Sequence, residues 1–244
     1  MFAFPDDLVT RHLTDFGAHT RPELAFLLSV VREGDRIFDL GAHIGTFTVP
    51  LAKRVGPSGR VLAVEGVAET CALTVRNVAL NDVADRVQIR NVILASPGTY
   101  EAVGAAGNTG ATFFRESSAG VSSAVTLDEL VAETFVPDVL KIDLEGLEAR
   151  VLLPSLMVRE RKPVMYVEVS PALLERAGSS VEVLGRFFDS AGYRMFRNVG
   201  ARNAVSDSFD VAKLRRLEDG GPFFDALAIH ADDPRLHVFD RTMT

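Results

Sequence analysis

Four carboxylates of this chain, Asp39, Glu65, Asp143 and Glu168, lie on or at the end of short apolar runs typical of buried strands. In an open α/β sheet, ligands bind outside the carboxyl ends of the parallel strands. If these runs are parallel neighbours, the four side chains meet on one rim of the sheet. There they could accept hydrogen bonds from ligand hydroxyls, remove a proton as general bases or hold a metal ion.

The segment Pro137-Asp-Val-Leu-Lys-Ile-Asp-Leu-Glu-Gly-Leu-Glu148 places ionised groups inside one of these apolar strands. Buried charges are costly unless they are paired or used. Lys141 and Asp143 are two residues apart, so they share a sheet face, and Glu145 follows at the carboxyl end. The spacing leaves two interpretations open. Lys141 and Asp143 form an ion pair that only holds the strand end, or Asp143 acts on a ligand; both can apply together.

A glycine turn follows the first of the four strands. Its pattern, D-x-G-x-x-x-G, lacks the third glycine of dinucleotide-binding turns and the lysine of phosphate-binding loops. A strand that ends in glycines at a helix start lets a ligand lie against bare backbone, and the helix N-terminus adds N–H donors. The alternative is a tight turn with no ligand. We expect a cofactor to contact Asp39, Gly41, Ala42, His43, Gly45 and Thr46, and Asp143 is expected to position the cofactor as well or to act in catalysis.

Glu65 ends the next apolar strand, one helix-length after the glycine turn. In nucleotide-binding sheets, a carboxylate at this place accepts both hydroxyls of a ribose. Two acceptor oxygens facing two donor hydroxyls make a bidentate contact. Glu65 is therefore predicted to bind the cofactor's ribose, and the alternative is a solvated charge at a strand end.

Alternating helical and strand patterns along the chain predict a parallel sheet covered by helices on both faces. Ser96–Ser123, rich in small residues, is interpreted as an excursion or hairpin over the sheet edge, and Thr126 and Glu129 are spaced as a capping box. We expect a single domain over 1–244, with 1–33 as an N-terminal helical cap. The predicted helices are Arg21–Arg32, Thr46–Val55, Ala68–Leu80, Thr126–Phe135 and Val181–Ala191; the predicted strands are Ile37–Leu40, Arg60–Glu65, Val87–Ile93, Val139–Leu144, Val164–Val169, Tyr193–Val199 and Phe224–His230.

Composition narrows the class of protein. The chain has 244 residues, 47% of them hydrophobic, and a formal net charge of −7. No apolar run approaches the roughly 18 residues of a membrane span, and the first residues do not resemble a secretory signal. The single cysteine, Cys71, indicates a reducing cytoplasm. The net charge disfavours a nucleic-acid partner, so the run Lys213–Arg216 is interpreted as a solvated helix face; the histidines outside any motif, expected at the surface, are His12, His19, His230 and His237.

Together these segments resemble the FkbM family of S-adenosylmethionine (SAM)-dependent methyltransferases. The resemblance rests on D-L-G-A-H-I-G, V-E, N-x-x-x-L-N, N-T-G, T-L-D, K-I-D-L-E-G-L-E and Y-V-E-V, in that order. It implies a class I SAM-methyltransferase fold: a Rossmann-like, doubly wound α/β sheet of seven strands, mostly parallel, with the last strand inserted antiparallel. It also implies SAM as cofactor and a hydroxyl acceptor on a sugar, polyketide or similar small molecule. The chain departs from the family pattern twice, with His43 where the family usually has Asn and Gly66 where it usually has Pro.

An alcohol acceptor is protonated at neutral pH, so a base beside it would assist methyl transfer. Asp143 is the first candidate, followed by Glu145 and Glu168, and His43 is a further one. In a rival mechanism, Asp143 and Glu168 hold Mg²⁺, which would acidify the hydroxyl; we expect no metal. A SAM- or nucleotide-binding module without catalysis is the alternative from another class, and the missing dinucleotide spacing disfavours an NAD-dependent oxidoreductase.

Overall fold

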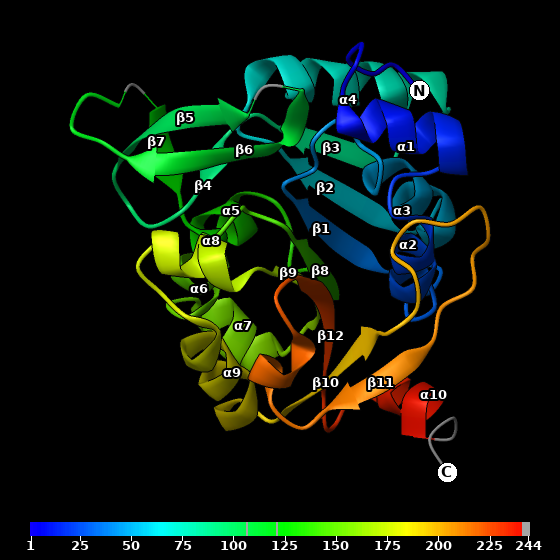
Figure 1. Ribbon diagram of the computed structural model, residues 1–244, viewed down its shortest axis with the longest axis vertical. Helices are drawn as coiled ribbons and strands as arrows, with labels where there is room; N and C mark the ends of the chain where they lie inside the picture. The colour runs from blue at the N-terminus through cyan, green and yellow to red at the C-terminus, as the bar shows by residue number, and fades with distance from the viewer. Residues whose placement is uncertain (106, 121, 241–244) are drawn as a thin grey trace.

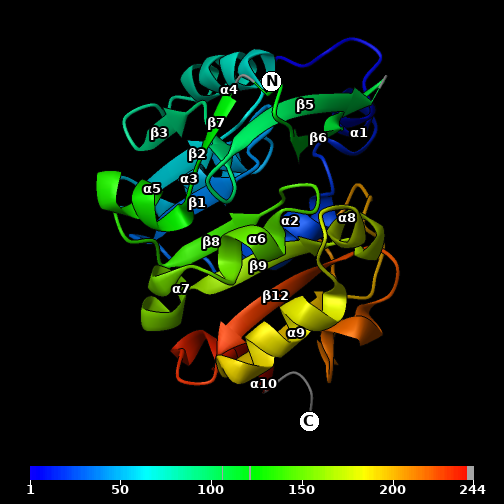
Figure 2. The same cartoon turned by 90° about the vertical axis from the view of Figure 1, so that its left-hand side faces the viewer.

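The computed structural model describes residues 1–105, 107–120 and 122–240. Within them, eight strands form one sheet in the order β11-β10-β12-β9-β8-β1-β2-β3 (Figures 1 and 2). Neighbours from β9 to β3 are parallel, whereas β12 runs antiparallel between β9 and β10. The strands are β1 (Arg36–Leu40), β2 (Arg60–Val64), β3 (Val87–Arg90), β8 (Val139–Ile142), β9 (Val164–Val169), β10 (Tyr193–Asn198), β11 (Val211–Leu214) and β12 (Phe224–His230).

The class I methyltransferase fold predicted from the sequence is confirmed, including the antiparallel insertion of the last strand. The expected seven strands are one too few, because β11 adds an antiparallel strand beside β10. Lys213 lies on β11, so the prediction of a solvated helix face over Lys213–Arg216 was wrong. The strand has only four residues and lies at the edge of the sheet, where lysine side chains commonly face solvent. Exposed charges are therefore expected on such a strand as well as on an exposed helix face.

Helices cover both faces of the sheet, and each face has its own core. On one face, Phe38, Leu62 and Leu140 pack against helices that follow β7, β8 and β9. On the other, Ile37, Val61 and Val139 pack against α2, α3 and α4. The alternation along each strand between these two cores is the doubly wound pattern. The helices are α1 (Leu8–Phe16), α2 (Arg21–Leu28), α3 (Thr48–Val55), α4 (Ala68–Leu80), α5 (Leu127–Glu133), α6 (Glu148–Leu152), α7 (Leu156–Arg161), α8 (Pro171–Arg176), α9 (Val181–Ser190) and α10 (His237–Asp240), with 3-10 turns at Leu217–Gly220 and Pro234–Leu236.

A second, four-stranded sheet lies beside the carboxyl end of the main one (Figures 1 and 2). It contains β4 (Ile93–Leu94), β5 (Thr99–Ala105), β6 (Asn108–Glu116) and β7 (Ser122–Val125) in the order β4-β7-β5-β6. The single strand predicted over Val87–Ile93 was wrong, because β3 ends at Arg90 and β4 belongs to the other sheet. The break begins at Asn91, whose side-chain amide donates to the Glu65 carbonyl at 2.7 Å. Residues 106 and 121 of the predicted excursion lie outside the described residues.

The N-terminal helix α1 packs on β6 of the small sheet, so the two together cover the carboxyl end of the main sheet. Asp7 caps α1 by accepting from the Val9 N–H at 2.9 Å, and Gly17 ends the helix with φ +77°. At α5, the predicted capping box between Thr126 and Glu129 is present in both directions. None of the described helices has the length and apolar character needed to cross a membrane.

Candidate active site

A cavity of about 400 Å³ lies at the carboxyl ends of β1, β2, β8 and β9, under α1 and β6. Its volume falls within the range of roughly 300–1,000 Å³ typical of small-molecule sites. Of the site residues predicted from the sequence, the structure brings eight to the cavity wall and leaves out Asp39 and Gly45. The eight are Gly41, Ala42, His43, Thr46, Glu65, Asp143, Glu145 and Glu168.

The glycine turn offers the cavity backbone surface rather than free donors. The N–H groups of Gly41 and Ala42 both donate to the Val64 carbonyl, at 3.0 and 2.9 Å. The His43 N–H donates to the Glu65 carboxylate at 2.8 Å, and the Gly45 N–H returns to the Ala42 carbonyl. These four N–H groups of the turn are therefore already bonded within the protein, and α3 itself begins only at Thr48.

At Gly41, the glycine turn after β1 packs directly against the end of β8 that carries Asp143. With φ +79°, this residue adopts a conformation that favours glycine, and a Cβ there would overlap the Asp143 carbonyl oxygen. Gly45 is also left-handed, and its Cα faces Thr74 of α4 rather than the cavity. Gly41 thus permits close contact between the ends of β1 and β8, which brings the turn next to Asp143.

Lys141 explains the buried charges of β8. Its ammonium group donates to the Gly41 carbonyl at 2.8 Å and to Asp143 at 3.3 Å, and lies 3.4 Å from Asp39. Burial alone would lower the pKa of Lys141, but the carboxylates of Asp143, Asp39 and Glu168 outweigh it and raise that pKa. Asp39 is fully buried and accepts from the Thr48 hydroxyl at 2.6 Å. Its carboxylate therefore holds Lys141 and the start of α3 from behind, and does not line the cavity.

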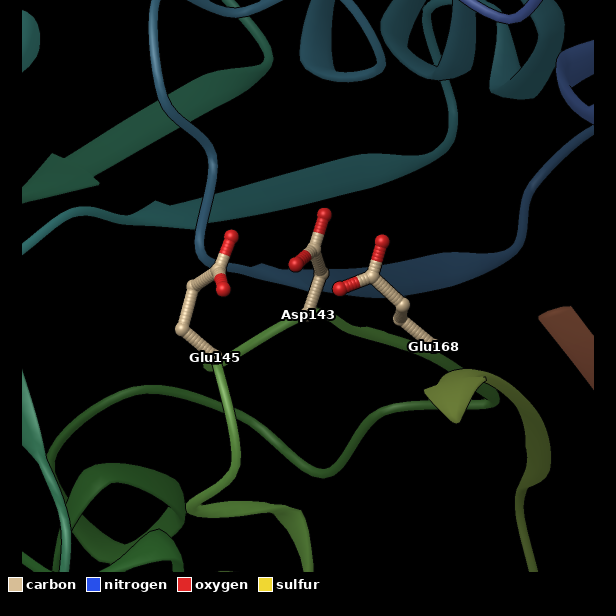
Figure 3. A group of neighbouring side chains, drawn as sticks. All are labelled: Asp143, Glu145 and Glu168. Carbon is tan, nitrogen blue, oxygen red and sulfur yellow. The ribbon is translucent and has the colours of Figure 1, made fainter. Parts of the chain in front are cut away.

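Asp143, Glu145 and Glu168 point into one space, as Figure 3 shows, with one oxygen of each lying within 4.8 Å of the others. The Asp143 side chain is 34% exposed, whereas its partner Lys141 is 5% exposed. Burial, and then the charges of Asp143 and Glu148, raise the pKa of Glu145 to about 8. Burial, with the charges of Asp143 and Asp225, raises the pKa of Glu168 well above its usual value. The cluster can thus hold protons at neutral pH or accept a cation.

The loop after β8 is shaped to present Glu145. Glu145 and Gly146 both have positive φ, +54° and +108°, and a Cβ on Gly146 would overlap the Leu173 carbonyl. The buried Glu148 accepts from the N–H groups of Leu144 and Gly146, at 2.9 and 3.1 Å. A positive φ is uncommon for a residue other than glycine, and such strained conformations cluster at functional sites. Within K-I-D-L-E-G-L-E, the last Glu is therefore the residue that holds the turn.

Glu65 lies in the cavity wall with both oxygens engaged. One accepts from the His43 N–H and the other from the Val67 N–H, each at 2.8 Å. Burial raises the pKa of Glu65 despite these bonds. Each carboxylate oxygen has a second lone pair, so both can still accept from a ligand. The following Gly66 leaves room for the Phe114 ring, which a Cβ at this position would overlap, so the proline usual in the family would not fit here.

A chain of hydrogen bonds joins the glycine turn to the cover. The His43 ring nitrogen Nε2 lies 2.8 Å from the Thr109 hydroxyl on β6. The Asp7 carboxylate accepts from that hydroxyl at 3.0 Å and from the Thr109 N–H at 2.7 Å. His43 has φ +50°, a conformation in which His and Asn are both enriched, so the departure from the family's Asn fits the turn. Burial lowers the pKa of His43 to about 4, which keeps the ring neutral.

Several cavity residues were missed by sequence reasoning. Arg202 pairs with Asp225 and lies 3.9 Å from Glu168, and it contacts the Phe223 ring, 4.6 Å from its centroid. Asp225 follows a Pro-Phe-Phe run at the start of β12. Its pairing with Arg202 joins two distant segments, so no local sequence pattern predicts it. The expectation that His12, His19 and His230 are surface residues was wrong. His12 on α1 and His19 on the loop after α1 line the cavity, and His230 is buried on β12.

The sequence model described as the Methyltransferase FkbM domain matches residues 39–195, which is most of the chain. The chain belongs to this family. It is therefore a SAM-dependent methyltransferase, as the sequence predicted, and the matched range includes the glycine turn, Glu65 and all three clustered carboxylates. The N-terminal 38 residues, including α1, lie outside the match.

Other comparisons show similarity at longer range. Cofactor-bound Rv0187 from MTB superposes with a TM-score of 0.52 at 17% identity, over 88% of this chain and 81% of that one. A SAM-dependent methyltransferase from Aquifex aeolicus gives 0.46 at 15% identity, over 92% and 94%. A 59-residue stretch is 39% identical to the 23S rRNA (uracil(1939)-C(5))-methyltransferase RlmD of Acinetobacter baylyi, and covers 24% of this chain but 13% of that enzyme. The match to Rv0187 supports the fold of the FkbM methyltransferase.

Proposed function

We propose that this FkbM methyltransferase methylates a hydroxyl of a small molecule, with Asp143 as the general base. The observation that carries the proposal is the position of the Asp143 carboxylate. It is partly exposed to the cavity, held by Lys141 and placed where the glycine turn meets β8. Glu145 and Glu168 are the alternative bases, but burial raises the pKa of both, and the pKa of about 8 for Glu145 favours its protonated form at neutral pH.

The volume of the cavity and the Glu65 carboxylate in its wall support binding of SAM here. We propose that Glu65 accepts the ribose hydroxyls and that Gly41, Ala42, His43 and Thr46 contact the cofactor through the surface of the turn. When bound, SAM supplies a methyl group already activated by its sulfonium sulfur. Ile93, Leu94 and Phe114 give the half of the cavity beside Glu65 an apolar wall, which suits a flat aromatic base.

The protein's part in the reaction is then orientation and proton removal. Methylation of a hydroxyl releases one proton, because the ether oxygen carries none. Asp143 would take that proton, while Lys141 stabilises the carboxylate and fixes its direction. Alignment of the acceptor oxygen can supply much of the rate enhancement, and a positioned base typically adds a further factor of about 10²–10⁴.

A small, uncharged acceptor suits this cavity better than a phosphate-rich one. Acidic side chains in its wall outnumber the cations, which are Lys141 and Arg202, and both of these already pair with carboxylates. Methylation of an unactivated ring carbon needs a nucleophile to activate it, yet Cys71 is buried on α4 and does not line the cavity. We therefore keep the prediction of a hydroxyl acceptor and no nucleic-acid partner as part of the proposal.

A metal-assisted mechanism is the second candidate, and the three carboxylates of Figure 3 favour it. Mg²⁺ prefers oxygen ligands and commonly binds through one or two carboxylates plus water. The structure adds Glu145 to the pair Asp143 and Glu168 considered from the sequence. A bound cation would hold Glu145 and Glu168 ionised and would acidify the hydroxyl directly.

A labelled-methyl screen tests the proposed function. Wild-type protein is incubated with radiolabelled SAM and a panel of sugars, polyketide-type alcohols, peptides and RNA, with and without EDTA. We expect label in a hydroxylated small molecule, and no loss with EDTA. Label only in RNA or peptide would overturn the acceptor class, whereas loss with EDTA and recovery with Mg²⁺ would favour the metal-assisted mechanism.

A further inference from the structure

His12 and His19 form a pair that neither the family pattern nor the proposed mechanism uses. Their Nδ1 atoms are 3.0 Å apart, and their ring planes are nearly parallel, at 18°, with centroids 5.0 Å apart. Both rings line the cavity, and both residues precede the range that the family model matches. The pair is thus a feature of this chain's N-terminal segment rather than of the FkbM domain.

The backbone is built to bring the two rings together. His12 lies on α1, which Gly17 ends in a left-handed conformation. Two residues later His19 precedes Thr20, which is buried and has φ +44°. A positive φ in a β-branched residue is an outlier that only surrounding structure can maintain. This tight return between α1 and α2 places His19 against His12, one side of the pair facing the cavity.

The contact between the Nδ1 atoms decides the protonation of both rings. One Nδ1 must carry the proton and the other must accept it, because two N–H groups would repel. The ring with Nδ1–H then has a free lone pair on Nε2, and the other ring has Nε2–H. Among the described residues, neither Nε2 atom has a hydrogen-bond partner in the protein. The pair therefore carries one Nε2 acceptor and one Nε2 donor, on two rings that line the cavity.

We propose that His12 and His19 form an acceptor-binding subsite that recognises adjacent uncharged hydroxyls. This inference rests on the proposed function and deepens it. One Nε2 lone pair accepts from a hydroxyl, while the other ring donates its N–H to a neighbouring oxygen. Without a charge on the pair, an acceptor phosphate gains no ion pair there, so the subsite selects polyols over their phosphate esters.

The charged surroundings agree with a neutral pair. Burial has the largest effect on the pKa of His19 and lowers it to about 4. The charges of His12, His43 and Arg202 lower this pKa further, whereas the charge of Asp143 opposes them. Burial and the charges of Arg11 and Arg202 lower the pKa of His12, against the opposing charge of Asp15.

The pair can be tested without knowing the acceptor. In ¹⁵N-histidine-labelled protein, long-range ¹H–¹⁵N spectra at pH 7 report the tautomer and charge of each ring. We expect His12 and His19 to be neutral and to have opposite tautomers. In His12→Gln, the tautomer of His19 should no longer be set by a neighbouring histidine. Identical tautomers, or a cationic ring at pH 7, would overturn the proposal.

Methyl transfer to each hydroxylated hit of the labelled-methyl screen gives the functional test. For His19→Phe we expect KM for the acceptor to rise about 3- to 10-fold, the loss of one hydrogen bond, with SAM affinity unchanged. His19→Gln, which keeps a donor and an acceptor, should keep KM for the acceptor close to the wild-type value. His237→Phe, exposed on α10, is the matched control. An unchanged KM in folded His19→Phe and His12→Phe would overturn the subsite, while the role of Asp143 is judged separately by Asp143→Asn.

Discussion

The replacement of Glu65 by alanine separates two roles that the structure gives to one carboxylate. Its oxygens accept from the His43 and Val67 N–H groups, each at 2.8 Å, and we propose that they also accept the SAM ribose hydroxyls. Loss of the protein partners affects stability, whereas loss of the ribose partners affects only binding. The two effects can therefore be measured on the same variant.

The expected magnitudes follow from hydrogen bonds to a charged acceptor. Two N–H groups lose their acceptor at about 1 kcal/mol each, the low end of the range because water in the cavity can replace it, so the unfolding free energy should fall by about 2 kcal/mol. The ribose contact is a charged hydrogen-bond pair, for which about 1.5–3 kcal/mol is typical. SAM affinity should therefore fall by roughly 10- to 150-fold.

Calorimetric titration with SAM and urea unfolding give the two numbers. Glu69→Ala is the matched control, because it removes the same charge from an exposed position on α4. It should change SAM affinity by less than about twofold. If folded Glu65→Ala binds SAM as tightly as wild type, Glu65 is only a brace for the turn and the ribose contact must lie elsewhere.

Three further predictions follow from the packing around the cavity. Gly41→Ala should fold poorly or lose SAM binding, since its Cβ would overlap the Asp143 carbonyl; normal expression, stability and binding would contradict the locked turn. Thr109→Val should weaken SAM binding by about 0.5–1.5 kcal/mol by breaking the bonds between His43 and Asp7; equal affinity in calorimetry would show that the cover does not support the turn. The control is Thr99→Val on β5, which removes a hydroxyl bonded to the Ser117 carbonyl outside the cavity. In the folded protein, the pKa of Glu145 is raised from its ordinary 4.5 to about 8. Between these pH values the folded state therefore binds one more proton than the unfolded state, and the stability that this proton contributes is lost as the pH rises through 8. Glu145→Gln, always neutral, should flatten that fall in urea unfolding between about pH 5 and 8.5, and an unchanged slope would contradict the raised pKa.

The sequence was most informative where chemistry and local geometry coincide. The helix Ala68–Leu80 and the strands Val164–Val169 and Phe224–His230 were predicted at their observed bounds, because apolar periodicity and turn residues delimit them. The pairing of Lys141 with Asp143 also followed from the spacing of two residues on one strand. Such features depend on neighbours in the chain and can be predicted from them.

The parts that were missed depend on contacts between distant segments. Arg202 reaches Asp225 and Glu168 from a loop after β10, and His12 and His19 reach the cavity only because α1 packs on β6. Asp39 looked like a rim carboxylate, yet Lys141 and Thr48 enclose it behind the turn. The sequence shows the type of each residue but not which side of a strand end remains open.

The central claim is that Asp143 acts on the acceptor's proton in this FkbM methyltransferase. Asp143→Asn keeps the shape of the side chain but is a very poor base, so kcat should fall by about 10²-fold or more while the Kd for SAM changes by less than about threefold. Asp189→Asn, exposed on α9, controls for the loss of a charge. Both are measured with the acceptor found in the labelled-methyl screen, in the presence of EDTA. Wild-type turnover in Asp143→Asn would contradict the account and leave Asp143 as a structural partner of Lys141.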